Sequence, residues 1–121
     1  MSARGHSLFV AAALSAALAV AAGAFGAHGA ASPQAAEWLR TGAQYQMIHA
    51  VAVFALALGG RFTRQGWLML AGAAIFALTL YAMALGGPRW LGAVTPVGGM
   101  FLIAAWLWIA FSAASMPRQS L

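Results

Sequence analysis

Four long apolar runs, separated by short breaks that contain glycine, proline or arginine, account for most of this 121-residue chain. An α-helix needs about 20 apolar residues to cross a hydrocarbon layer of about 30 Å, and each run has about that length. The pattern predicts an all-α integral membrane four-helix bundle with spans at about residues 8–27, 42–60, 66–85 and 96–114. We expect residues 1–121 to form a single transmembrane domain, because these spans leave no room for a soluble one.

The breaks between the runs contain two helix-start signals. Ser32-Pro33 is typical of an N-cap followed by proline at the first helical position, and Thr95-Pro96 has the same form before the last span. After Pro33 come Trp38 and arginine, which both favour the membrane–water interface. We therefore predict a short interfacial helical segment before the second span. Whether residues 33–41 continue straight into that span or bend away from it stays open.

Small residues mark two places where helix backbones could approach closely. Ser15, Ala19 and Gly23 recur every fourth residue in the first run, which is the spacing of helix contacts in lipid. Gly98 lies in the first turns of the last span, where we expect its bare backbone to pack against a neighbouring helix. For the first run, an ordinary abundance of alanine is an equally good explanation.

Most of the polar side chains gather on the second span. Because helical residues four apart share a face, one polar stripe is formed by Glu37, Thr41, Tyr45 and His49. An unpaired polar group in hydrocarbon costs several kcal/mol. The polar side chains at mid-depth are those of Gln44, Gln46 and His49. They should therefore point inward or toward a second copy. The candidate functional residues are Glu37, Thr41, Gln44, Tyr45, Gln46 and His49, with His28 and Thr95 as companions at one end of the bundle.

The expected role of these residues is hydrogen bonding inside the bundle. For His49 we expect a partner on another span, for example Tyr81, Thr79 or a backbone carbonyl near Gly98. Thr79 can instead donate to its own helix, four residues back. The same stripe is compatible with a homo-oligomer or a larger membrane complex.

Composition and charge support the membrane assignment. Hydrophobic residues make up 64% of the chain, charged residues 6%, and mean hydropathy is +0.86. The net charge of +5 comes from six arginines and one acid, spread over the ends of the runs, which indicates anchoring in the lipid bilayer rather than binding to nucleic acid. Four arginines lie on the side of the two termini and two lie opposite. The expected localisation is the inner membrane, multi-pass, with both termini cytoplasmic.

Several classes of activity lack the residues they need. His28 and His49 differ in depth and have few companion ligands, so no metal and no cofactor is expected. The only acid, Glu37, lies at the membrane edge and is expected to pair with Arg40, which argues against proton-coupled export. Paired carboxylates, a serine–histidine–acid set and a phosphate loop are all missing, so the protein is not expected to be an enzyme. A structural or accessory membrane component remains, with a transporter or channel for a small polar solute as the alternative.

Three blocks of sequence carry a family resemblance: GAFGAH at residues 23–28, TGAQYQMIH at 41–49 and TPVGG at 95–99. In this order and in a chain of this length, they resemble the YgdD-like family of small bacterial inner-membrane proteins. This is the domain-of-unknown-function family four-two-three, which has eukaryotic transmembrane relatives. The resemblance implies a four-helix inner-membrane protein and implies no activity. Relatives often have Ser and Gly where this chain reads FALTLY at 76–81, which puts a close helix contact there in doubt.

Overall fold

The computed structural model describes residues 2–118, and within this range the chain forms helices and no strands. The elements are α1 (Ala3–His28), α2 (Pro33–Gly59), α3 (Thr63–Ala84), the short 3₁₀ helix η1 (Arg89–Ala93) and α4 (Thr95–Ala114). α1, α2, α3 and the η1–α4 segment are each long and apolar enough to cross a membrane. The predicted all-α membrane bundle is thus confirmed.

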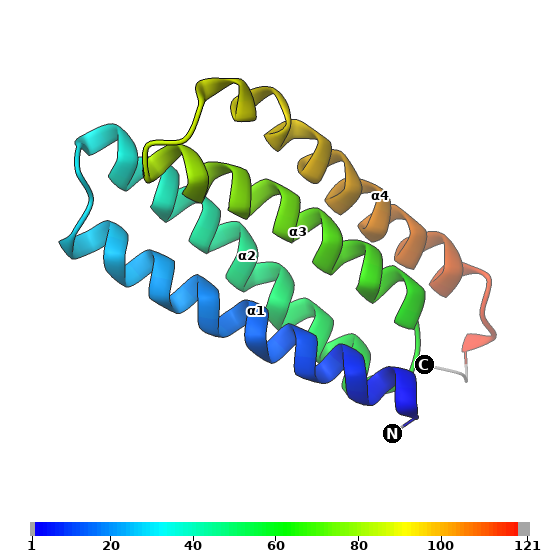
Figure 1. Ribbon diagram of the computed structural model, residues 1–121. Coiled ribbons are helices and arrows are strands. Elements are labelled where there is room, and N and C mark those ends of the chain that lie inside the picture. Colours follow the sequence, from blue (N-terminus) through cyan, green and yellow to red (C-terminus); the bar gives the residue numbers. More distant parts are fainter. Residues whose placement is uncertain (1, 119–121) are drawn as a thin grey trace.

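The long helices lie side by side in chain order (Figure 1). α1 packs on α2, α2 on α3 and α3 on α4, and α1 also touches α3. No Cα atom of α4 lies within 8 Å of a Cα atom in α1 or α2. α4 is therefore an edge helix. Among the long helices, only α3 has backbone atoms close to the backbone of α4. The start of α1 and the end of α4 lie at the same end of the molecule.

α2 is one continuous helix from Pro33 to Gly59, which settles the question that the sequence left open. Its start has the predicted cap, because Ser32 Oγ accepts a hydrogen bond from the Ala35 backbone N–H at 3.1 Å. Gly42 does not bend the helix. Its missing side chain instead makes room for Tyr81, whose ring carbon Cε1 would lie 2.6 Å from a Cβ at this position.

The predicted cap at Thr95 is wrong. Val94 takes the N-cap position in a helical conformation and provides no side-chain cap. Because η1 runs directly into α4, the carbonyl of Leu91 lies one turn before Thr95 and accepts a hydrogen bond from its hydroxyl at 3.2 Å. The Thr95 hydroxyl also meets that of Thr79, with 2.6 Å between the oxygens.

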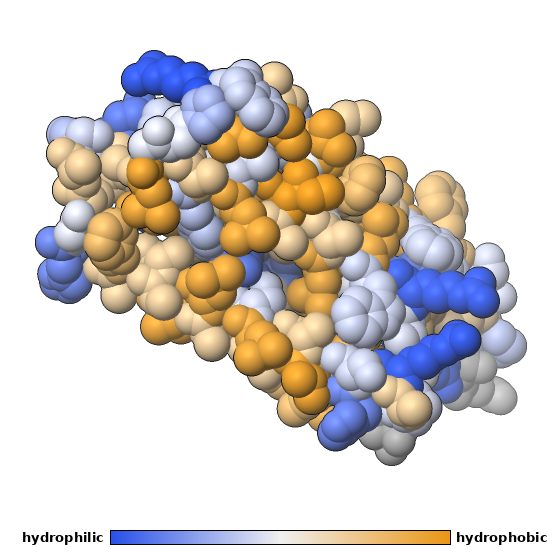
Figure 2. Space-filling model, in the orientation of Figure 1, coloured by the Kyte–Doolittle hydropathy of each residue, from blue (hydrophilic) through white to orange (hydrophobic). Residues whose placement is uncertain are grey.

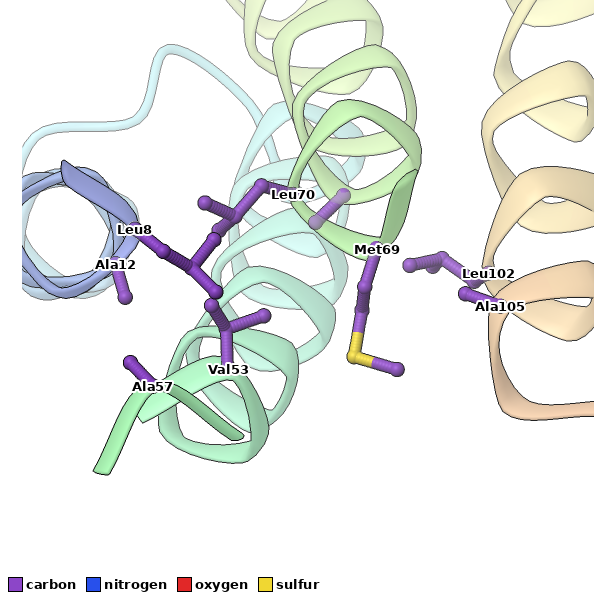
Figure 3. Packing of buried hydrophobic residues seen from close by; sticks show 9 residues of the cluster. Leu8, Ala12, Val53, Ala57, Met69, Leu70, Leu102 and Ala105 are labelled. Carbon is purple, nitrogen blue, oxygen red and sulfur yellow. The ribbon is translucent and has the colours of Figure 1, made fainter. Parts of the chain in front are cut away.

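Apolar side chains from all four helices form the larger of two core clusters, at the end of the molecule that holds the N-terminus. Met69 fills the space between α3 and α4, while Leu8 and Val53 join α1 to α2 (Figure 3). The cluster consists of Leu8, Ala12, Val53, Ala57, Met69, Leu70, Ala73, Leu102 and Ala105. Toward the other end, a second cluster of mostly small residues joins α1, α2 and α3 around Tyr81. Figure 2 shows hydrophilic residues gathered at the two ends and an apolar band between them.

Small residues let the helix backbones come close, as was predicted for Gly98 and as one of the two explanations of the first run proposed. On α1, Ala19 is buried, and a Cβ at Gly26 would lie 2.9 Å from the Cβ of Leu39 on α2. At Gly98, a Cβ would lie 2.4 Å from the backbone nitrogen of Phe76 and 2.6 Å from the carbonyl oxygen of Gly72. A close contact between α3 and α4 is therefore present near Phe76, where the resemblance put it in doubt.

Candidate functional site

Three polar side chains, joined by hydrogen bonds into the Ser15–Gln46–Tyr81 chain, link α1, α2 and α3 in the middle of the protein. Gln46 on α2 donates from Nε2 to the hydroxyl of Ser15 on α1 at 3.1 Å. Its amide oxygen accepts from the hydroxyl of Tyr81 on α3 at 2.7 Å. Gln46 is 3% exposed and Tyr81 is 7% exposed, so the Tyr81–Gln46 bond is buried. Gln46 thus takes the inward position that the sequence predicts for it.

His49 lies one turn along α2 from Gln46 and connects α2 to α4. The indole Nε1–H of Trp106 donates to His49 Nε2 at 3.1 Å, and His49 Nδ1 lies 2.6 Å from the carbonyl oxygen of Tyr45. Because Nε2 accepts, the ring proton is on Nδ1 and the imidazole is neutral. Both ring nitrogens are therefore engaged within the protein: Nδ1–H donates to the Tyr45 carbonyl, and the one available lone pair, on Nε2, accepts from Trp106.

His49 bonds a group on another span, as predicted, but the partner is Trp106 and none of the three groups given as examples. The Tyr81 hydroxyl donates to Gln46 instead. Thr79 donates to the carbonyl of Ile75, four residues back on its own helix, which is the alternative that the sequence offered for this residue. His49 instead meets Trp106, whose long side chain bridges a gap that the backbones of α2 and α4 do not close. A sequence signal for this bond exists, because Trp106 lies mid-span whereas tryptophan favours the membrane interface.

The polar stripe of Glu37, Thr41, Tyr45 and His49 is buried only at its His49 end. Tyr45 is 45% exposed, and its ring stacks on His49 and contacts Phe76, with ring centroids 6.2 and 4.6 Å apart. Thr41 is half-buried. Glu37 is exposed and forms the predicted ion pair with Arg40. The stripe therefore runs from the surface into the bundle instead of lying wholly inside it.

Gln44 does not point inward, which was the first of the two positions predicted for it. It is exposed, while Gln46 is buried. Two residues along an α-helix correspond to a rotation of about 200°, so the two amides cannot share a face. Gln44 instead lies on the outer face of α2 with Ile48 and Val51, which are also exposed.

The two predicted companions lie apart from the Gln46 and His49 contacts. His28 is exposed as the last residue of α1. Thr95 is buried between α3 and α4, where it meets Thr79.

A further link between α3 and α4 was not predicted. The buried amide of Gln65 lies 3.1 Å from the hydroxyl of Ser112. With its oxygen turned toward α4, the amide also accepts from Trp108 Nε1 at 3.3 Å, while its nitrogen donates to the Phe62 carbonyl at 3.2 Å. The apolar run of the third span starts after Gln65, whereas α3 already starts at Thr63, so this residue looked like part of a loop.

Comparison with known proteins identifies close relatives by sequence. Residues 22–99 match the family model described as "Protein of unknown function (DUF423)". The chain is 40% identical to the UPF0382 membrane protein YwdK of Bacillus subtilis over 84% of this chain and 90% of the relative. It is 36% identical to a UPF0382 membrane protein of Haemophilus influenzae, over 82% and 86%. It is 32% identical to the UPF0382 inner membrane protein YgdD of Escherichia coli K12, over 93% and 92%. No solved structure matches the chain.

Proposed function

The chain belongs to the DUF423 family of membrane proteins, and we propose that it serves as a structural or accessory component of the bacterial inner membrane, without enzymatic activity. The observation that carries this proposal is the pairing of its buried polar side chains with one another. Within residues 2–118, every buried side-chain nitrogen and oxygen has a hydrogen-bond partner. The bonds of Gln46, His49, Thr95 and Gln65 each join two helices. Their work is to fix how the helices pack.

The outward position of Gln44 supports the view that the protein is part of an assembly. Gln44 lies about 16 Å along α2 from Pro33, well inside a helix of about 40 Å that crosses about 30 Å of hydrocarbon. An amide that faces lipid at this depth has no partner for its hydrogen bonds, which is costly. A second copy or another membrane protein that covers the outer face of α2 would supply one.

We expect a photo-crosslinking residue at position 44 to yield a discrete protein–protein adduct in intact cells. The matched control is position 103, because Ile103 is an exposed apolar residue on α4, away from this face. The adduct's mass, measured by mass spectrometry, distinguishes a homo-oligomer from a complex with another protein. Lipid adducts alone at both positions would contradict the assembly.

Transport of a small polar solute is the alternative, because Gln46 and Ser15 line a groove on the protein. The rest of that groove is apolar, formed by alanine, leucine and tryptophan side chains. A path for a polar solute needs polar walls for most of its length, and these walls do not provide them. Solute flux in reconstituted vesicles that His49→Leu abolishes, without loss of folding, would overturn the structural proposal and favour transport.

We infer that both termini face the cytoplasm. Arg4, Arg61, Arg64 and Arg118 belong to the end that holds the start of α1, whereas Arg40 and Arg89 belong to the opposite end. Positive charge favours the cytoplasmic side, so a fluorescent protein fused to the C-terminus should fluoresce and a phosphatase fused there should be inactive. Strong phosphatase activity from the C-terminal fusion would refute this orientation.

A further inference from the structure

A groove runs between α1 and α3 and exposes part of the Ser15–Gln46–Tyr81 chain to the membrane interior. Its first hollow has a volume of about 410 Å³ and is lined by Leu14 and Leu18 of α1 and by Trp67 and Leu78 of α3, with Gln46 among the lining residues. Leu18 and Leu78 also line a second hollow of about 460 Å³. The two hollows therefore adjoin each other on the apolar surface.

The three polar side chains have more donor hydrogens than they use. Ser15 and Tyr81 carry one hydroxyl hydrogen each and the Gln46 amide carries two, which makes four donors. Within the described residues these side chains form two hydrogen bonds, both with one another. Two donor hydrogens therefore remain without an acceptor, and this count is the same whichever way the amide is turned.

The residues that carry the spare donors line the groove. Ser15 and Gln46 line its first hollow, and Tyr81 lines the second. Gln46 itself is 3% exposed, and the groove is where it meets its surroundings. A donor without an acceptor in an apolar environment costs about 1 to 3 kcal/mol. A ligand that brings an acceptor to this point would remove that cost.

The depth of Gln46 selects the kind of ligand. It lies midway along α2, about 20 Å from Pro33 and about 20 Å from Gly59 at 1.5 Å per residue. In a bilayer whose hydrocarbon core is about 30 Å thick, this position is near the centre. The ester groups of phospholipids lie at the edges of that core, about 15 Å away. An acceptor at the centre must therefore belong to an uncharged molecule that dissolves in the hydrocarbon.

We propose that the groove binds a neutral lipid-soluble carbonyl compound, of the class of long-chain ketones and alkyl quinones. Its carbonyl oxygen accepts from the Gln46 amide and the Ser15 hydroxyl, and its apolar tail lies along Leu18 and Leu78 into the second hollow. The groove volume falls in the range of about 300 to 1,000 Å³ that is typical of small-molecule sites. This inference is independent of the structural role proposed above.

The test uses the purified full-length protein in lipid nanodiscs, with a decyl-substituted benzoquinone as the probe. Trp67 lines the groove, so a bound quinone should quench tryptophan fluorescence in a saturable way. We expect Ser15→Ala and Gln46→Leu each to weaken the binding of the quinone at least tenfold. Gln44→Leu should leave it unchanged, because this matched amide lies two residues away on the outer face.

Three results would overturn the proposal. Quenching that does not saturate shows partition into the lipid only. Equal competition by a decyl-substituted cyclohexane, which lacks the carbonyl, shows an apolar groove without a polar subsite. An equal loss of affinity in Gln44→Leu and Ser15→Ala shows that the effect does not come from the groove. Should Gln46→Leu fail to fold, Ser15→Ala decides the matter, because it keeps the Tyr81–Gln46 bond.

Discussion

Gly98→Ala is expected to push α4 away from α3 and to destabilise the protein by about 2 to 3 kcal/mol. The added methyl group would lie 2.4 Å from the Phe76 nitrogen and 2.9 Å from the Phe76 Cα, and these backbone atoms cannot rotate away. The displacement should also break the contact between Thr79 and Thr95, which joins the same two helices. Unfolding in mixed micelles, followed by circular dichroism, measures the loss.

Gly99→Ala is the matched control for this experiment. Its new Cβ would lie 3.9 Å from the nearest atom, a ring carbon of Phe76, which is an ordinary contact. Both substitutions gain the same helix propensity, about 1 kcal/mol in a soluble helix, so the difference between them isolates the clash. Equal stabilities of the two variants would show that α3 and α4 are not tightly packed at Gly98.

Gln46→Leu is expected to destabilise the bundle by about 2 to 3 kcal/mol. The substitution removes the bonds to Ser15 and Tyr81, and interhelical hydrogen bonds in membranes contribute roughly 0.6 to 2 kcal/mol each. It also leaves the buried Tyr81 hydroxyl without its acceptor, which adds to the loss. The measurement is the free energy of unfolding, with Gln44→Leu as a control of the same chemistry on the exposed face.

A second substitution shows whether the unpaired hydroxyl causes the loss. Tyr81→Phe removes the hydroxyl, so in the Gln46→Leu background it should restore part of the stability, while it lowers stability in the wild-type chain. The coupling between the two sites, measured in a double-mutant cycle, should be at least 0.5 kcal/mol. Purely additive effects would show that the bond between these side chains contributes nothing to folding.

Features that depend on a few neighbouring residues could be predicted from the sequence. The Ser32 cap, the Glu37–Arg40 ion pair and the Thr79 bond to its own helix each join residues three or four positions apart. The spans themselves follow from the length of apolar runs that a bilayer demands. For such features the helix geometry alone brings the groups together.

The partners of the buried polar residues could not be predicted in the same way. Gln46 meets Ser15 and Tyr81, which are 31 and 35 positions away, and His49 meets Trp106 at a separation of 57. These contacts depend on how each helix is rotated about its axis, and apolar residues on every face of a membrane helix conceal that rotation. The four-residue spacing of the polar stripe on α2 includes neither glutamine, so it gave no reason to expect Gln46 rather than Gln44 in the interior. Only Gln46 is buried.

The position of α4 at the edge has a consequence for how the protein is made. Its described residues bury only Thr95, Gly98, Leu102 and Ala105, and its backbone touches α3 and η1 alone. The first three helices make their mutual contacts without it, so they can assemble in the membrane while the ribosome is still translating the last span. We therefore expect α4 to dock last, on a surface that is already in place, where Trp106 donates to His49.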